Sequence, residues 1–258
     1  MNHLEQNRHS WNAGIMAGSV WAQPVDTQVI AKARAGTWDV WLTPKTPVPK
    51  AWLGDVRGKE VLCLASGGGQ QVPVFAAAGA RVTSFDLSDV QLAKDQAVAD
   101  RERLDIRCVQ GDMADLGALD GESFDLIFHP AANVFVPDLR PVWAGCHRVL
   151  RPGGALLAGF MNPALFLFDH EEASRTGELR VKYTLPYADV DQLDAATLVA
   201  KREAGDVLEF SHSLTTQIGG QADAGFAITG LFEDHWHDDT WLFSRHAPVS
   251  IATRAVRG

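Results

Sequence analysis

The sequence has no apolar run long enough to cross a membrane, because a spanning helix needs about 20 consecutive apolar residues. It also has no cluster of basic residues, and its formal net charge is −9. Nucleic-acid binding depends on cationic groups that displace counterions from phosphates. The opening stretch, MNHLEQNRHSWNAG, lacks the charged and then apolar pattern of a signal peptide. We therefore expect a soluble, cytoplasmic protein that binds neither membranes nor nucleic acid.

Cysteine is scarce. Cys63, Cys108 and Cys146 are the only three, and they lie far apart in apolar surroundings. No C-x-x-C pair occurs, so the spacing of a zinc or redox site is absent. We expect three buried structural thiols in a reducing compartment.

What the sequence does have, from residue 59 onward, is a regular alternation of strand-length and helix-length segments. Strands are predicted at 60–65, 81–86, 106–112, 123–130, 152–160, 227–234 and 248–256. Helices are predicted at 70–78, 88–103 and 139–150, with Ser88 as an N-cap. This order implies parallel strands with right-handed crossovers and helices on both faces. The predicted fold is α/β and doubly wound.

Two regions depart from that rhythm. Residues 1–55 hold five of the eight tryptophans, and we interpret them as an N-terminal helical cap with helices at 4–20 and 26–35. The tryptophans serve either packing or an aromatic wall over a substrate pocket. Residues 56–258 form the main domain, with an insertion at about 161–213 after the fifth strand. Residues 206–213 are predicted as a strand of this insertion, and the segment that follows it, 214–226, is predicted to be helical.

A loop with three glycines, Gly67 to Gly69, follows the first strand, where α/β sheets usually bind ligands. It is not a P-loop, because no Gly-Lys-Ser or Gly-Lys-Thr follows. A dinucleotide fingerprint would place a small residue where Val72 stands. The interpretation that remains is a nucleoside ligand without a pyrophosphate. Asp86, at the end of the second strand, can accept bonds from both ribose hydroxyls.

A second polar turn, GDMADL, follows the third strand. Asp112 could accept the exocyclic amine of adenine, and Met113 could lie along the ring; a simple polar turn is the alternative.

Five motifs, VLCLASGGGQ, FDLS, QGDMADL, SFDLIFHP and RVLRPGG, follow the order and spacing of the class I S-adenosylmethionine-dependent methyltransferases. RVLRPGG is the most specific of them. The resemblance covers residues 58–160, and the last two predicted strands fit the antiparallel end of that family's sheet. It implies a mostly parallel seven-stranded sheet with an antiparallel last strand, S-adenosylmethionine as cofactor and S-adenosylhomocysteine as product.

The resemblance also implies roles for individual positions. The residues that it places at the cofactor are Ala65, Ser66, Gly67, Gln71, Asp86, Leu87, Gln91, Asp112, Met113 and His129. Ala65 to Gly67 would lie beside the methionine moiety, with Gln70 or Gln71 near its amino or carboxylate end. Leu87 would pack on adenine. The family usually has an acid at Cys63 and glycine at Ala65. The missing acid leaves one contact of the loop or the cofactor's amine open, and Ser66 and Gln71 are the candidates to replace it.

Methyl transfer requires alignment more than proton transfer, because the sulfonium already activates the methyl group. His129, just after the fourth strand, is predicted to face the sulfonium and to be the catalytic base where one is needed. It could equally bond the backbone and shape the pocket. Asn133 is a weaker candidate. HPAANVF stands where methylases of amino groups in nucleic acid or protein often carry Asn/Asp-Pro-Pro-Tyr. A small-molecule acceptor is therefore expected.

Three alternatives stay open. One is an NAD(P)-dependent oxidoreductase, and another is a noncatalytic cofactor-binding regulatory protein. The third is a metal site in DHWHDD at 234–239, where His235 and His237 alternate beside acids. A solvated loop without metal is the preferred interpretation of that segment. The oligomeric state is not determined by the sequence.

Overall fold

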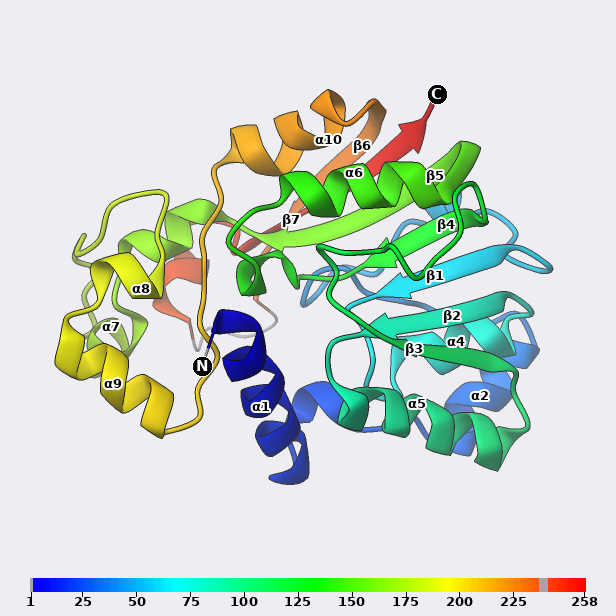
Figure 1. Cartoon of the computed structure of the whole chain (residues 1–258), viewed down its shortest axis with the longest axis horizontal. Helices are drawn as coiled ribbons and strands as arrows, with labels where there is room; N and C mark the ends of the chain where they lie inside the picture. The colour runs from blue at the N-terminus through cyan, green and yellow to red at the C-terminus, as the bar shows by residue number, and fades with distance from the viewer. Residues whose placement is uncertain (1, 237–240) are drawn as a thin grey trace.

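The computed structural model describes residues 2–236 and 241–258. Its centre is a seven-stranded sheet in the order β3-β2-β1-β4-β5-β7-β6 (Figure 1). The strands are β1 (Glu60–Leu64), β2 (Arg81–Asp86), β3 (Ile106–Gln110), β4 (Phe124–His129), β5 (Leu150–Met161), β6 (Phe226–Asp234) and β7 (Ser250–Arg257). The first five pair in parallel, whereas β7 runs antiparallel to both β5 and β6. The predicted sheet and its antiparallel last strand are confirmed.

Helices cover both faces of this sheet, and others lie beyond its carboxyl edge (Figure 1). The helices of the described residues are α1 (His3–Met16), α2 (Thr27–Arg34), α3 (Lys50–Leu53), α4 (Gln71–Ala77), α5 (Asp89–Glu102), α6 (Arg140–Val149), α7 (His170–Thr176), α8 (Asp189–Gln192), α9 (Ala195–Glu203) and α10 (Gly220–Asp223). In the described part of the chain, none of them is long and apolar enough to span a bilayer. Helices α4, α5 and α2 lie on one face, and α6 and α10 lie on the other.

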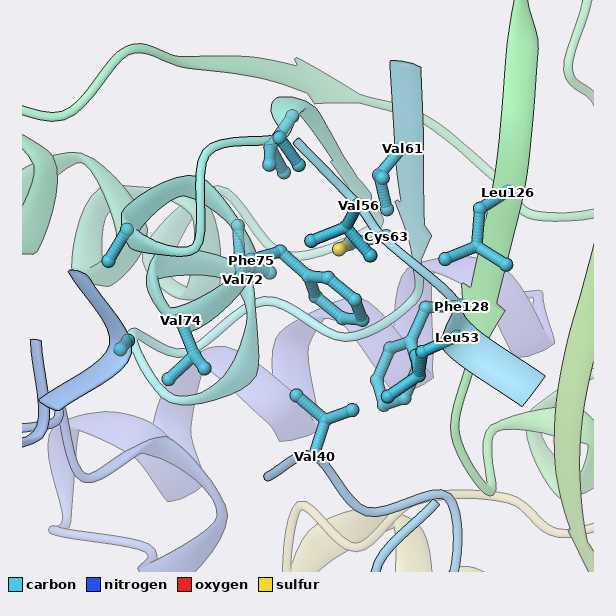
Figure 2. Close-up of a cluster of buried hydrophobic side chains, with 14 of the residues drawn as sticks. Val40, Leu53, Val56, Val61, Cys63, Val72, Val74, Phe75, Leu126 and Phe128 are labelled. Carbon is cyan, nitrogen blue, oxygen red and sulfur yellow. The ribbon is translucent and has the colours of Figure 1, made fainter. Parts of the chain in front are cut away.

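Strand β1 shows why the sheet is buried on both sides. Val61 and Cys63 belong to the apolar cluster under α4 and α5, and Leu62 and Leu64 belong to the cluster under α6. All four side chains are fully buried. Alternation between the two faces with no polar residue is the pattern of a central parallel strand. Figure 2 shows the first cluster, with Phe75 of α4 beside Cys63.

Helix α1 of the cap and helices α7, α8 and α9 of the insertion lie beyond the carboxyl ends of β1, β2 and β4 (Figure 1), whereas α2 of the cap packs against α4. The helices predicted at 4–20 and 26–35 are confirmed as α1 and α2. The segment 214–226 is helical as predicted, with one π turn at Thr215–Gly219 before α10.

The strand predicted at 206–213 is wrong. Its residues are extended, but its only pairing is an isolated bridge from Phe210 to Ala188. Its backbone amides bond elsewhere, because Leu208 N–H donates to Asn7 Oδ1 at 2.7 Å and Phe210 N–H donates to the carbonyl of Val134 at 2.8 Å. The segment therefore connects α1 to the chain after β4 instead of joining a sheet.

Asp234, at the end of β6, fastens the proline-rich turn of the cap to the sheet. The buried carboxylate accepts hydrogen bonds from the hydroxyls of Thr43 and Thr46 and from the backbone N–H groups of Lys45 and Thr46, all within 2.8–2.9 Å. Burial raises its pKa, but the bonds from Thr46, Thr43 and Lys45 outweigh burial and hold the pKa below the ordinary 3.8.

Replacing Asp234 by alanine is expected to lower the free energy of unfolding at pH 7 by about 3 kcal/mol, because buried donors lose their acceptor. A depressed carboxyl pKa stabilises the fold above pH 3.8 and stops doing so as the pH falls through the folded-state value. The difference in unfolding free energy between the variant and the wild type should therefore shrink as the pH falls below 3.8. Urea unfolding from pH 7 down to pH 3 measures it, with the exposed Asp120→Ala as control. A deficit under 1 kcal/mol at pH 7 would contradict this role.

Candidate functional site

The glycine loop after β1 directs three consecutive N–H groups inward, toward β2 and α5. Gly67 N–H donates to Asp86 Oδ2 at 3.0 Å, Gly68 N–H to the carbonyl of Gln91 at 3.2 Å, and Gly69 N–H to Asp95 Oδ1 at 2.7 Å. None of these donors is free to bind a ligand. The loop therefore presents its carbonyl groups to a ligand, which can approach the backbone closely because the glycines have no side chains.

The cap closes over the outer side of this loop. Val25 N–H donates to the carbonyl of Gly69 at 2.8 Å. Gly68 has a φ of +123°, and a Cβ there would stand 3.1 Å from the carbonyl oxygen of Trp21 and 2.6 Å from Gln91 Oε1. Glycine is required at this position both by the backbone conformation and by the space.

Ala65 stands where the family usually has glycine, and its backbone conformation shows what that difference costs. Its φ is +49°, in the left-handed region, and its N–H donates to the carbonyl of Phe85 at 2.7 Å. Alanine in this conformation costs about 1–2 kcal/mol relative to glycine. The position thus has the conformation that glycine favours, and the surrounding bonds hold alanine in it.

Asp86 lies at the carboxyl end of β2 and lines the cavity beside the loop. Its carboxylate accepts from the N–H groups of Gly67 and Ser88 at 3.0 and 2.9 Å. A carboxylate has about four acceptor positions, so acceptor capacity remains for a ligand's hydroxyls. Burial raises its pKa to about 6, against the lowering effect of those N–H bonds.

The same wall of the cavity contains Leu87, Gln91, Asp112 and Met113, together with Ser66. The structure thus brings together the side chains that the sequence placed around a nucleoside. Gln91 Oε1 is buried and has no hydrogen-bond partner among the described residues. An orphaned acceptor on a cavity wall fits a ligand that donates a hydrogen bond. Asp112 Oδ1 accepts from Ala114 N–H at 3.0 Å, so part of its carboxylate serves its own turn.

The two glutamines at the start of α4 are already engaged by the cap. The side-chain amide of Gln71 bonds both the N–H and the carbonyl of Trp41, and Gln70 Nε2 donates to the carbonyl of Val20 at 2.9 Å. Both residues line the cavity. They hold the cap on the loop, so their amides are engaged within the protein and are not free for a cofactor's amino or carboxylate group.

His129 does not lie where the sequence predicts. It is fully buried and is absent from the cavity wall. Its Nδ1 donates to the carbonyl of Leu64 at 3.0 Å, and its Nε2 lies 2.8 Å from the side-chain amide of Asn133. Burial lowers its pKa. The interpretation of His129 as a base or cofactor contact is therefore corrected, because the ring points under α6 and packs edge-on against Trp143.

The cavity is larger than the nucleoside wall needs, at about 1450 Å³. Typical small-molecule pockets measure about 300–1,000 Å³. Its far part is built by the cap and the insertion, and four of the five cap tryptophans line it: Trp11, Trp21, Trp38 and Trp41. The fifth, Trp52, packs against Phe232 instead.

Sequence reasoning missed the polar groups of the insertion. Tyr187 donates to Asp189 Oδ1 at 2.7 Å, and Lys201 Nζ lies 3.2 Å from Asp189 Oδ2. Glu209 lines the cavity beside them and has no hydrogen bond or ion pair to the described residues through its carboxyl group. Burial raises the pKa of Glu209 above the ordinary 4.5. Nothing local in the sequence connects these positions, which the fold assembles from separate segments.

The suggested metal site in DHWHDD loses two of its donors to other contacts. Asp234 binds the turn of the cap, as described above, and His235 Nδ1 donates to the carbonyl of Ser244 at 2.8 Å. The other candidates, His237, Asp238 and Asp239, lie outside the described residues. Among residues 2–236 and 241–258, no group of three His, Cys, Asp or Glu side chains is placed to hold a metal ion.

The chain is similar in sequence to known methyltransferases. A family model described as a methyltransferase domain matches residues 62–158, which span the glycine loop to β5. The chain is 45% identical to the uncharacterized methyltransferase YbaJ of Bacillus subtilis, over 258 residues and 100% of both chains.

Two solved structures share the fold. The S-adenosylmethionine-dependent methyltransferase of Mesorhizobium loti matches 81% of this chain and 95% of its own, with 22% identity and a TM-score of 0.63. The 1,6-didemethyltoxoflavin-N1-methyltransferase of Burkholderia thailandensis, solved with that compound and S-adenosylhomocysteine bound, matches 98% and 88%, with 16% identity and a TM-score of 0.58. Because the match at 45% identity runs over the whole of both chains, this protein belongs to the methyltransferase family, and its fold is that of S-adenosylmethionine-dependent methyltransferases.

Proposed function

We propose that this enzyme methylates a small molecule held inside the cavity and releases S-adenosylhomocysteine. The observation that carries the proposal is the size and construction of the cavity. One part lies along the glycine loop and Asp86, and the other lies between the cap and the insertion. A volume of about 1450 Å³ leaves room for an acceptor beside the cofactor. The solved toxoflavin-precursor methyltransferase, which binds both a small acceptor and S-adenosylhomocysteine, supports this interpretation by analogy of fold.

The residues on the nucleoside wall would hold the cofactor. Asp86 keeps acceptor capacity for ribose hydroxyls beside its bonds to Gly67 and Ser88, and Gln91 Oε1 and Asp112 offer further acceptors. An NAD-type ligand fits less well, because a pyrophosphate requires loop N–H groups as donors. Here all three glycine N–H groups are used within the protein.

The chain's part in the reaction is to bind, orient and exclude water. When bound, the cofactor supplies an activated methyl group on a sulfonium. The cap, bonded to the loop through Val25 and Gln70, and the insertion together enclose the acceptor. Enclosure and alignment lower the barrier for an in-line displacement. A site between the cap and the insertion favours a small acceptor over a folded macromolecule.

Glu209 replaces His129 as the proposed acceptor-side base. Phe210, the next residue, donates its N–H to the carbonyl of Val134 in the segment after β4, which also lines the cavity. Burial outweighs the opposing charge of Lys201 and raises the pKa of Glu209, and its carboxyl group makes no hydrogen bond or ion pair within the described residues. Such a group is suited to take a proton from a hydroxyl or amine as the methyl group arrives.

We further propose that the enzyme works in the cytoplasm. Its three cysteines are all free, and Cys63 and Cys146 are buried. Burial raises the pKa of Cys146 to about 12 and that of the half-buried Cys108 to about 11. Unreactive thiols of this kind suit a reducing compartment.

Calorimetric titration tests the cofactor site without knowledge of the acceptor. The wild-type protein should bind S-adenosylhomocysteine and not NAD. Asp86→Ala should weaken that binding roughly 100-fold, since it removes bonds to a charged acceptor. The exposed Asp105→Ala should bind like the wild type. Binding of NAD alone would refute the assignment.

Transfer from methyl-labelled S-adenosylmethionine to the small-molecule fraction of a metabolite extract tests the acceptor side. Glu209→Gln should lower the rate about 100-fold, the usual worth of a general base, and should leave the dissociation constant for S-adenosylhomocysteine unchanged. The exposed Glu203→Gln at the end of α9 is the control. Label found only in macromolecules would contradict a small acceptor, and an unchanged rate would remove Glu209 from the mechanism.

A further inference from the structure

We propose that Asp95, on helix α5, is a positioning residue for the cofactor loop and supplies from the helix the buried carboxyl group that β1 lacks at Cys63. The inference rests on the proposed cofactor site. It concerns how the loop is held and not what the loop binds.

Asp95 joins the loop to the sheet. Its side chain is fully buried; Oδ1 accepts from Gly69 N–H and Oδ2 accepts from the hydroxyl of Ser84 on β2, each at 2.7 Å. Gly69 has a φ of +77°, so this part of the loop has neither helix nor sheet to bond its N–H. Asp95 is the acceptor that satisfies that buried donor.

Cys63 faces the same space from β1. It belongs to the apolar cluster that includes Val98 and Ala99, one turn along α5 from Asp95 (Figure 2 shows Cys63 in this cluster). Cys63 is the register partner of Ser84 on β2, and Ser84 is the residue that Asp95 bonds, so the two side chains lie on the same face of the sheet. Burial, and then the negative charge of Asp95, raise the pKa of the Cys63 thiol. A carboxyl group at both positions would bring two buried acids together, which is unfavourable.

Asp95 can hold the loop whether or not it is ionised. Burial raises its pKa to about 7, with the charge of Asp86 adding to the effect and the bonds from Ser84 and Gly69 opposing it. A neutral carboxyl group still accepts from Gly69 N–H and can donate to Ser84, and an asparagine amide can do the same. Hydrogen bonding, rather than charge, is thus the property that the position needs.

The test compares Asp95→Ala, Asp95→Asn and the double variant Asp95→Ala/Cys63→Asp, with Asp100→Ala on the exposed side of α5 as control. Calorimetry measures the dissociation constant for S-adenosylhomocysteine, and thermal unfolding confirms that each variant is folded. Asp95→Ala should bind about tenfold more weakly, the loss of one or two hydrogen bonds. Asp95→Asn should stay within about threefold of the wild type, and the double variant should regain most of the lost affinity.

A folded Asp95→Ala variant that binds S-adenosylhomocysteine like the wild type would overturn the proposal. An Asp95→Asn variant that binds as weakly as the alanine variant would also overturn it. A folded double variant that regains no affinity for S-adenosylhomocysteine would overturn the claim that the carboxyl group of Asp95 on α5 replaces one at Cys63 on β1. If the wild-type protein itself does not bind S-adenosylhomocysteine, the proposed function fails before this inference is reached.

Discussion

Three glycine N–H groups that turn away from the cavity have to find acceptors inside the protein, and this requirement organises the site. The acceptors are the carboxylate of Asp86, the carbonyl of Gln91 and the carboxylate of Asp95, all from the β2–α5 unit. An unsatisfied buried N–H costs about 1–3 kcal/mol, so the loop, β2 and α5 are fixed relative to one another. Asp86 is held in the same way, with its remaining acceptor positions at the cavity.

The same loop determines what covers the site. Because the N–H groups of the loop are bonded to β2 and α5, the cap can contact only its outer side. Val25 of the cap bonds the loop there, and the side chains of Gln70 and Gln71, which follow the loop, bond the backbone of the cap. The turn of the cap is tied in addition to Asp234 of β6. Cap, loop and sheet edge are therefore one connected structure, and the insertion encloses the remaining part of the cavity. This arrangement is the physical basis for the proposal of a small acceptor.

Local patterns in the sequence predict much of this and miss the rest for identifiable reasons. The apolar runs predict the strands, and Ser88 predicts the start of α5, because strands and caps depend on neighbouring residues. His129 was misjudged because its position at a strand end indicates the site but not which face its ring takes. Asp95 was missed because the direction of Gly69 N–H depends on a positive φ. Glu209 comes from a distant segment, which no local pattern connects to β4.

The central claim is that a nucleoside lies along this loop with its ribose at Asp86. A crystal structure of the wild-type protein with S-adenosylhomocysteine tests it most directly. The account predicts both ribose hydroxyls within hydrogen-bond distance of the Asp86 carboxylate, the Gly67, Gly68 and Gly69 N–H groups still bonded inward, and open space beyond the sulfur toward the cap and insertion. A nucleoside bound elsewhere, or glycine N–H groups turned outward to the ligand, would contradict it.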